Sequence, residues 1–301
     1  MTMPEQQRAK QGVLLAIAAY TMWGVAPIYF KALDNVPALE ILSHRIVWSV
    51  LLLALLIHFT QGWTRFKQVI TQKKRTFLLL CSATLVAINW LIFIWAVNSE
   101  MMLEASLGYY INPLFNVILG MLFLQERLRK LQWLAVALAA TGVFIELFAF
   151  GSIPYVAFAL AISFGVYGLL RKKINIDAQT GLFVETLFLF PVAAIYLLAI
   201  DTPTSNMWNN SMSLNSLLIA AGIVTTAPLL CFTAAATRLK LSTLGFFQYI
   251  GPSLMFLLAI TVYGEPLTEA KMITFSFIWM ALILFSFDGL KHHKRQKAVK
   301  A

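Results

Sequence analysis

Ten long runs of apolar residues follow one another along the chain, and short polar or basic segments separate them. Each run approaches the length of about 20 apolar residues that an α-helix needs to cross the hydrocarbon core of a membrane. The pattern predicts an all-α transmembrane fold and leaves no segment long enough for a soluble domain. The predicted spans are 12–33, 38–60, 76–98, 104–124, 129–149, 152–171, 179–200, 212–237, 242–263 and 268–288.

The composition agrees with a membrane protein. Of the 301 residues, 60% are hydrophobic and only 12% are charged, whereas soluble domains carry roughly 25% charged residues. The net charge of +10 does not indicate nucleic-acid binding, because the basic residues form short clusters between spans and no continuous basic face. Cys81 and Cys231 lie singly within spans, and neither a phosphate-binding glycine loop nor an HExxH pattern occurs. No metal or cofactor is therefore expected.

Basic residues lie almost entirely on one side of the predicted spans. The two termini and the loops after even-numbered spans hold 20 of the 23 Lys and Arg residues, which leaves Lys31, Arg45 and Lys271 for the other side. The positive-inside rule then places both termini in the cytoplasm, which requires an even number of spans. The first run lacks a small-residue cleavage site, so we expect it to remain as the first helix.

One basic segment, after the second span, also carries apolar residues at helical spacing, namely Trp63, Phe66, Val69 and Ile70. This spacing predicts a short amphipathic helix on the membrane surface. An ordinary basic loop is the alternative interpretation.

The second half of the chain repeats the first at a shift of 139 to 141 residues. Because each half holds five spans, an odd number, the second copy must enter the membrane from the opposite side. We therefore predict a first five-helix repeat over 1–150, an inverted second repeat over 151–290 and a basic cytoplasmic tail over 291–301. The clearest matches pair Tyr110 with Tyr249, Pro113 with Pro252, Glu126 with Glu265, Leu128 with Leu267, and Trp23-Gly24-Val25 with Phe164-Gly165-Val166.

Four stretches are distinctive: YTMWGVAPIYFK (20–31), EILSHRIVWS (40–49), EASLGYYINPLFNVILGMLFLQERL (104–128) and QYIGPSLMFLLA (248–259). They resemble the EamA-type branch of the drug/metabolite transporter superfamily and, more closely, the RarD family. The resemblance implies two inverted repeats in the bacterial inner membrane around a central cavity lined by the first, third, fourth, sixth, eighth and ninth helices. Members of the superfamily export amino acids, metabolites or drugs. RarD proteins carry a label of chloramphenicol sensitivity or resistance, which describes a phenotype and not a substrate.

Charged side chains inside spans are costly and are candidates for function. His44 and Arg45 lie one to two turns into the second span from the outside, and Glu185 lies at a similar depth in the seventh span from the inside. His44 and Glu185 match in the repeat, so they are expected at opposite mouths of one pathway. A direct Arg45–Glu185 ion pair would need strong helix tilting. We expect Arg45 to attract or gate a polar substrate and Glu185 to carry a proton or gate the inner side. Snorkelling or pairing with a neighbouring helix is the alternative for each.

Prolines within spans mark candidate helix breaks. Pro113 and Pro252 occupy matching positions in the two halves, and broken helices at matching positions point to a binding site. Tolerated kinks are the alternative, since proline is common in membrane helices. Pro27 in the first span is a third candidate break.

Amides and aromatic residues near these prolines complete the candidate site, because small-molecule sites combine apolar and aromatic walls with a few polar groups. Ordinary packing is the alternative for each residue. The candidates for substrate binding or gating are Tyr20, Trp23, Asn89, Trp90, Tyr110, Asn112, Gln248 and Tyr249, beside His44, Arg45 and Glu185.

We therefore expect a secondary transporter, an exporter of small organic solutes, and not an enzyme. A membrane-embedded enzyme would need a compact polar or metal-binding cluster, and a channel would need a continuous polar stripe along several helices. Neither is visible in the sequence. The expected partners are a small-molecule substrate and the lipid bilayer, and the sequence is compatible with a coupling proton and with a homodimer.

Overall fold

The computed structural model describes residues 5–99, 101–264 and 269–300, and this part of the chain is entirely helical apart from turns and loops. Ten of its helical segments are long and apolar enough to cross a membrane. The matches at Glu265 and Leu267 lie outside the described residues. The helices are α1 (Glu5–Lys31), α2 (Ala38–Phe59), α3 (Trp63–Ile70), α4 (Lys73–Asn98), α5 (Met102–Leu124), α6 (Lys130–Phe150), α7 (Tyr155–Ile174), α8 (Ala178–Ala199), α9 (Met212–Ala236), α10 (Leu241–Gln248), α11 (Ile250–Thr261) and α12 (Glu269–Lys300).

The predicted spans agree with these helices to within a few residues at most boundaries. The exceptions are the two ends of the chain, where α1 begins at Glu5 and α12 continues to Lys300. The basic segment 291–300 is therefore helical, which suits its Lys, Arg, Gln and Ala residues. Large apolar side chains stay exposed around the bundle, for example Phe148 at 83% and Leu198 at 88%. Such an apolar surface indicates a lipid environment, so the chain is a multi-pass membrane protein.

The predicted amphipathic helix forms as α3. Its rings pack on Phe183 of α8, with centroid distances of 5.9 Å from Trp63 and 5.2 Å from Phe66. Val69 is buried on the same helix. The apolar spacing of this segment thus serves contact with α8.

The three candidate breaks have different outcomes. The ninth span is divided at Tyr249 into α10 and α11, and Pro252 lies in the first turn of α11, where a missing N–H costs little. The expectation of breaks at Pro27 and Pro113 is corrected, because α1 and α5 run through them without interruption. One missing hydrogen bond is tolerated where neighbouring helices support the segment.

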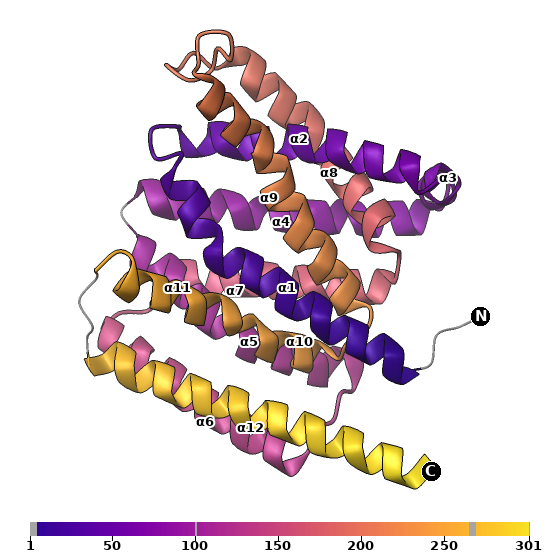
Figure 1. Cartoon of the computed structure of the whole chain (residues 1–301), viewed down its shortest axis with the longest axis vertical. Coiled ribbons are helices and arrows are strands. Elements are labelled where there is room, and N and C mark those ends of the chain that lie inside the picture. The colour runs from indigo at the N-terminus through magenta and orange to yellow at the C-terminus, as the bar shows by residue number, and fades with distance from the viewer. Residues whose placement is uncertain (1–4, 100, 265–268, 301) are drawn as a thin grey trace.

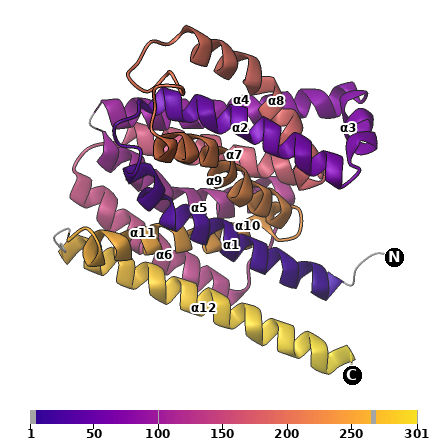
Figure 2. The ribbon, with the colours of Figure 1, turned by 45° about the horizontal axis from the view of Figure 1, so that its top comes forward.

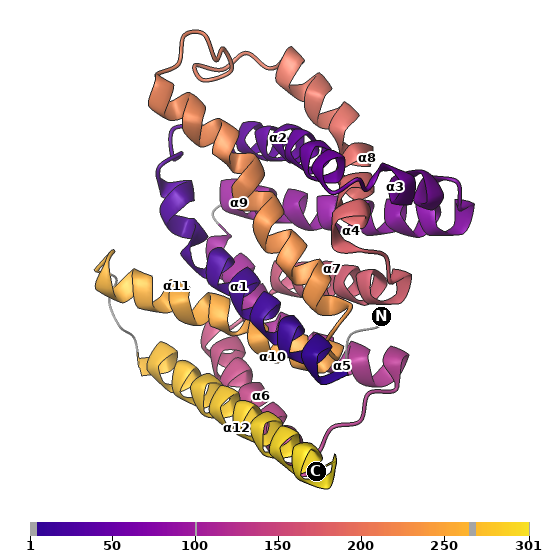
Figure 3. The ribbon, with the colours of Figure 1, turned by 45° about the vertical axis from the view of Figure 1, so that its right-hand side comes forward.

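The two halves of the chain interleave. In the first half, α1 packs on α9 and α11, and α2 packs on α8 and α9. Further along, α4 packs on α7 and α8, α5 packs on α7 and α10, and α6 packs on α12. In the predicted repeat, spans one to five correspond to spans six to ten. If each span is replaced by its counterpart, the same set of packed helix pairs results. Figure 2 shows α6 beside α12 along one edge of the bundle, and Figure 3 shows α9 passing between α1 and α2.

Both termini lie at one end of the bundle. Figure 1 shows the start of α1, the end of α12 and the short helix α3 on its right-hand side, which we call the termini end. The loop 200–211 between α8 and α9 lies at the opposite end, which we call the loop end.

Candidate functional site

Aromatic rings fill the centre of the bundle between the two halves. The aromatic cluster consists of Tyr20 and Trp23 of α1, Phe164 and Tyr167 of α7, and Phe232 of α9. Ring centroids lie 5.9 Å apart for Trp23 and Phe164, 5.7 Å for Trp23 and Phe232, and 6.0 Å for the stacked pair Tyr167 and Phe232. Tyr20 and Tyr167 are fully buried. The predicted site residues Tyr20 and Trp23 therefore meet at this cluster, packed against one another.

Counterparts in the repeat touch each other at this junction. Trp23 and Phe164, which match in sequence, form one of the ring pairs. The hydroxyl of Tyr249 donates a hydrogen bond of 3.2 Å to the carbonyl of its match, Tyr110. Residues that contact their own counterparts are expected where two related halves meet.

A buried polar cluster lies beside the aromatic cluster, formed by Ser82 of α4, Tyr167 and Arg171 of α7, and Glu185 of α8. Ser82 Oγ donates to Glu185 Oε1 at 2.5 Å, and Tyr167 Oη donates to Oε2 at 3.4 Å. Arg171 Nη1 lies 3.4 Å from Glu185 Oε1, and both side chains are 1% exposed. The basic cluster Arg171-Lys172-Lys173 was counted with the loop after the sixth span, and this is corrected, because α7 continues to Ile174.

Two features set the geometry of this ion pair. Gly181 makes room for it, since a Cβ at that position would lie only 2.2 Å from Arg171 Nη1. Arg171 Nε and Nη2 are buried and have no hydrogen-bond partner among the described residues. The Arg171–Glu185 pair is therefore incompletely satisfied, which is costly in a low-dielectric interior.

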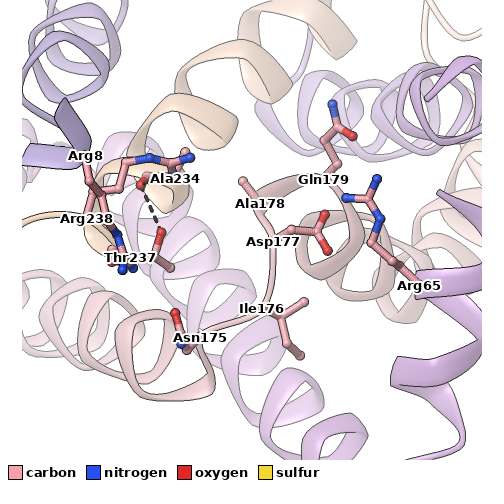
Figure 4. A pocket seen from close by; sticks show the side chains of 10 residues that line it. All are labelled: Arg8, Arg65, Asn175, Ile176, Asp177, Ala178, Gln179, Ala234, Thr237 and Arg238. Atoms are coloured by element: carbon pink, nitrogen blue, oxygen red, sulfur yellow. Dashed lines mark hydrogen bonds between the residues drawn. The ribbon is translucent and has the colours of Figure 1, made fainter. Parts of the chain in front are cut away.

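A cavity of about 500 Å³ opens at the termini end. It is lined by Arg8 of α1, Arg65 of α3, the segment 175–179 before α8, and Ala234, Thr237 and Arg238 at the end of α9. Figure 4 shows Arg8 and Arg238 on one side of this pocket and Arg65 with Asp177 on the other. Asp177 Oδ1 accepts a hydrogen bond of 2.9 Å from the backbone N–H of Thr180 and caps α8. The pocket therefore presents three guanidinium groups to one carboxylate that already has a partner.

Arg45 lies in the half of α2 near the loop end. Its Nε donates a hydrogen bond of 2.7 Å to Thr225 Oγ1 of α9. Its guanidinium carbon lies 5.1 Å from the ring centre of Trp90 and 5.6 Å from that of Phe30, within cation–π range. We call these four residues the Arg45 site. The direct Arg45–Glu185 ion pair considered from the sequence does not form, because Glu185 pairs with Arg171 and Arg45 donates to Thr225.

A buried carboxylate on α2, that of Glu40, binds the loop 200–211 at the loop end. Glu40 is fully buried, and its Oε2 accepts hydrogen bonds from Thr202 Oγ1 at 2.7 Å and Thr204 Oγ1 at 3.0 Å. His44, one turn further, is buried, and its Nδ1 accepts a hydrogen bond of 3.2 Å from Trp48 Nε1. The predicted site residue His44 therefore lies beneath the loop 200–211, and Glu40 ties that loop to α2.

The predicted amides tie helices together. Asn89 Nδ2 donates to the carbonyl of Leu160 at 3.0 Å and to Ser163 Oγ at 2.9 Å, which joins α4 to α7. Asn112 Nδ2 donates to the carbonyl of Ala161 at 2.7 Å, which joins α5 to α7. Buried amides are normally satisfied in this way.

Gln248 and Tyr249 stand at the division between α10 and α11. Gln248 Oε1 accepts a hydrogen bond of 3.2 Å from Asn116 Nδ2, which joins α10 to α5. Tyr249 is fully buried, and Tyr110 is half-buried with its ring centre 5.7 Å from that of Phe275. These residues do not line the pocket at the termini end, and their role in substrate binding stays a prediction.

One comparison with known proteins divides the chain at the same place as the predicted repeat. The model of the EamA-like transporter family matches twice, over residues 10–148 and 152–287. An uncharacterized transporter of Vibrio cholerae is 69% identical, with 96% of both chains covered. The protein RarD of Escherichia coli is 59% identical over 97% of this chain and 99% of its own. The chloramphenicol-sensitive protein RarD of Pseudomonas aeruginosa is 32% identical over 95% and 97%.

One solved crystal structure has the same fold. It superposes with a TM-score of 0.72, covers 92% of this chain and 97% of its own, and shares 16% sequence identity. At that identity the likeness concerns the fold alone.

Proposed function

The chain belongs to the RarD group of the EamA-like transporter family, a family of transporters and not of enzymes, and we propose that it is a secondary transporter of small organic solutes. Transport would proceed by alternating access between two inverted five-helix repeats. In such carriers the substrate site lies near the midplane between the repeats. The aromatic cluster, which joins α1, α7 and α9, is our candidate for part of that site.

The main support for this proposal is that residues at matching positions of the two halves contact each other. The pairs Trp23–Phe164 and Tyr110–Tyr249 join matching positions of the two repeats. The close approaches of Gly24 to Leu254 and of Gly165 to Phe115 also exchange under the same matching. Self-matching contacts support a pseudo-two-fold axis between the halves, and the double match of the family model supports the repeat itself.

The distribution of charge supports an orientation. Arg8, Arg65 and Arg238 line the pocket at the termini end, and the positive-inside rule assigns such residues to the cytoplasm. The termini end would then face the cytoplasm of a bacterial inner membrane, and the loop end would face outward. In this orientation the pocket would open toward the cytoplasm and the Glu40 contacts would hold the outer loop in place, as expected of an inward-facing state.

Glu185 is the proposed inner gate and carrier of a coupling proton. It is the buried carboxylate beside the aromatic cluster, and Arg171 and Tyr167 connect it to α7. Protonation would weaken the ion pair with Arg171 and release α8 from α7. Glu146 accepts a hydrogen bond of 3.0 Å from Thr274 at the α6–α12 edge. Its hydrogen bond therefore joins α6 to α12 and does not involve α7 or α8.

The solute proposed first is a drug or metabolite, such as chloramphenicol or an amino-acid-like compound. Chloramphenicol is drawn only from the name of the 32% identical relative, so it is the hypothesis to test directly.

Uptake of labelled chloramphenicol and labelled amino acids into proteoliposomes tests this function, with and without a pH gradient and beside empty liposomes. A carrier gives saturable uptake and counterflow. A linear flux without counterflow would indicate a channel, and a chemically altered solute would indicate an enzyme. Glu185→Gln is expected to abolish gradient dependence, whereas the matched Glu146→Gln should retain it. Retained gradient dependence in Glu185→Gln contradicts the proton role.

A further inference from the structure

Arg45 runs against the charge distribution of the chain. It is one of three basic residues outside the clusters that hold 20 of the 23 Lys and Arg residues, and it lies within a span, Ala38–Phe59. Topology therefore does not account for it. A cation at this depth is costly and needs a compensating interaction.

The protein compensates Arg45 only in part. Its Nε bonds Thr225, and the rings of Trp90 and Phe30 lie within cation–π range. A guanidinium carries five N–H donors, and the other four have no hydrogen bond to the described residues. The two ion pairs among the described residues are Arg129–Asp288 and Arg171–Glu185, so no described carboxylate neutralises Arg45.

We propose that the transported solute is an organic anion whose carboxylate or phosphate group binds Arg45. This rests on the proposed transport function and favours an anionic metabolite over the neutral chloramphenicol. Thr225 holds Nε in place, which leaves the terminal nitrogens as a planar fork that matches an anionic oxygen pair. Trp90 and Phe30 supply apolar surface for the organic body of the solute. In the low dielectric of this site such a pairing is much stronger than in water.

The pocket at the termini end has the same basic character. The pocket at the termini end is lined by Arg8, Arg65 and Arg238, and its one lining carboxylate, Asp177, caps α8. Basic residues at this end are expected from the positive-inside rule, so each one alone indicates little. Their convergence on one cavity means that an anionic solute meets positive charge at both ends of the path.

A structural tie between α2 and α9 is the competing role for Arg45, since its bond to Thr225 joins these helices. The two roles differ in what the wild-type protein carries. A tie sets no preference for the charge of the solute, whereas an anion site selects carboxylates or phosphates over neutral compounds and amines.

The test uses proteoliposomes of the full chain incubated with a small-molecule extract of bacterial cells, followed by mass spectrometry of the lumen. We expect the solutes that accumulate above empty liposomes to carry a carboxylate or phosphate, and the mass spectra distinguish the two. Accumulation of neutral or cationic solutes overturns the anion proposal while transport itself stands. No accumulation of any solute removes both the anion proposal and the transport function.

Variants assign the selectivity to the site. Arg45→Gln should abolish accumulation of the anions. Arg45→Lys keeps the charge but loses the fork, and should raise KM with a smaller effect on the maximal rate. The matched control is Lys31→Gln, which removes the cation over the ring of Tyr263 and should transport normally. If Arg45→Gln elutes as an intact protein and carries the same anions at the wild-type rate, Arg45 is not the binding residue.

Discussion

Gly181→Ala changes no charge, yet we expect it to disrupt the buried ion pair between Arg171 and Glu185. The added Cβ would lie 2.2 Å from Nη1, 2.7 Å from Nη2 and 2.8 Å from Cζ of Arg171. Ordinary contact begins at 3.4 Å, so the guanidinium must move by about 1.2 Å. The Arg171–Glu185 distance is already 3.4 Å, near the limit for a hydrogen bond. We expect a displacement away from the new Cβ to lengthen this distance and to weaken the contact between Arg171 and Glu185.

The sign of the effect distinguishes this reasoning from helix propensity. In an unobstructed helix, Gly→Ala stabilises by roughly 0.5–1 kcal/mol. Leaving one partner of a buried ion pair uncompensated costs about 3–5 kcal/mol. Gly181→Ala should therefore destabilise the protein by about 2–4 kcal/mol, the difference between these two effects. Thermal unfolding of the purified protein in detergent measures the change.

Two further variants make the test specific. Gly168→Ala is the matched control, because its Cβ would meet Phe232 at 3.4 Å, an ordinary contact. In the background Arg171→Met with Glu185→Gln, Gly181→Ala should become neutral or stabilising, since the obstructing guanidinium and the stranded carboxylate are both gone. A Gly181→Ala protein as stable as the wild type, or an equal loss of stability in both backgrounds, refutes the reasoning.

Three further predictions concern the ends of the helices. Glu126→Gln should lower stability by about 1–2 kcal/mol, because its carboxylate accepts hydrogen bonds from the first two backbone N–H groups of α10, at 2.6 Å and 3.0 Å; a melting temperature equal to that of the wild type contradicts this. Glu40→Gln should loosen the loop 200–211, and hydrogen exchange should show faster exchange there than in the wild type; unchanged protection would mean that the loop holds without the carboxylate. Arg129→Ala should cost less than about 1 kcal/mol, because the side chain that pairs with Asp288 is 36% exposed; a larger loss of stability in chemical denaturation would show a stronger tie between α6 and α12.

The helices could be predicted from the sequence, because hydropathy is a local signal. The contacts between side chains of different helices could not be predicted in this way. Arg171 stands in the basic run Arg171-Lys172-Lys173, and nothing local distinguishes it from its exposed neighbour Lys173. Its burial depends on Glu185 and on the space beside Gly181, and both belong to α8, a different helix.

The role of the candidate residues in substrate binding stays a prediction, and their contacts could not be predicted from the sequence. Charge within a span singled out Arg45 and Glu185, but their partners Thr225 and Arg171 come from other helices. Pro113 was expected to break α5, yet the helix continues because α7 and α10 support it on both sides. The repeat was the most informative long-range signal, since Trp23 and Phe164 match in sequence and touch in space.

The most direct test of alternating access is a distance measurement across the pocket at the termini end. Spin labels at Gln179→Cys and Thr237→Cys, on opposite sides of this pocket (Figure 4), report its width by double electron–electron resonance. The free cysteines Cys81 and Cys231 are replaced by serine, and the protein is reconstituted in liposomes. We predict two distance populations, with the shorter one enriched when transported solute is added. A single distance that stays unchanged while the same protein transports solute would contradict alternating access between the two halves.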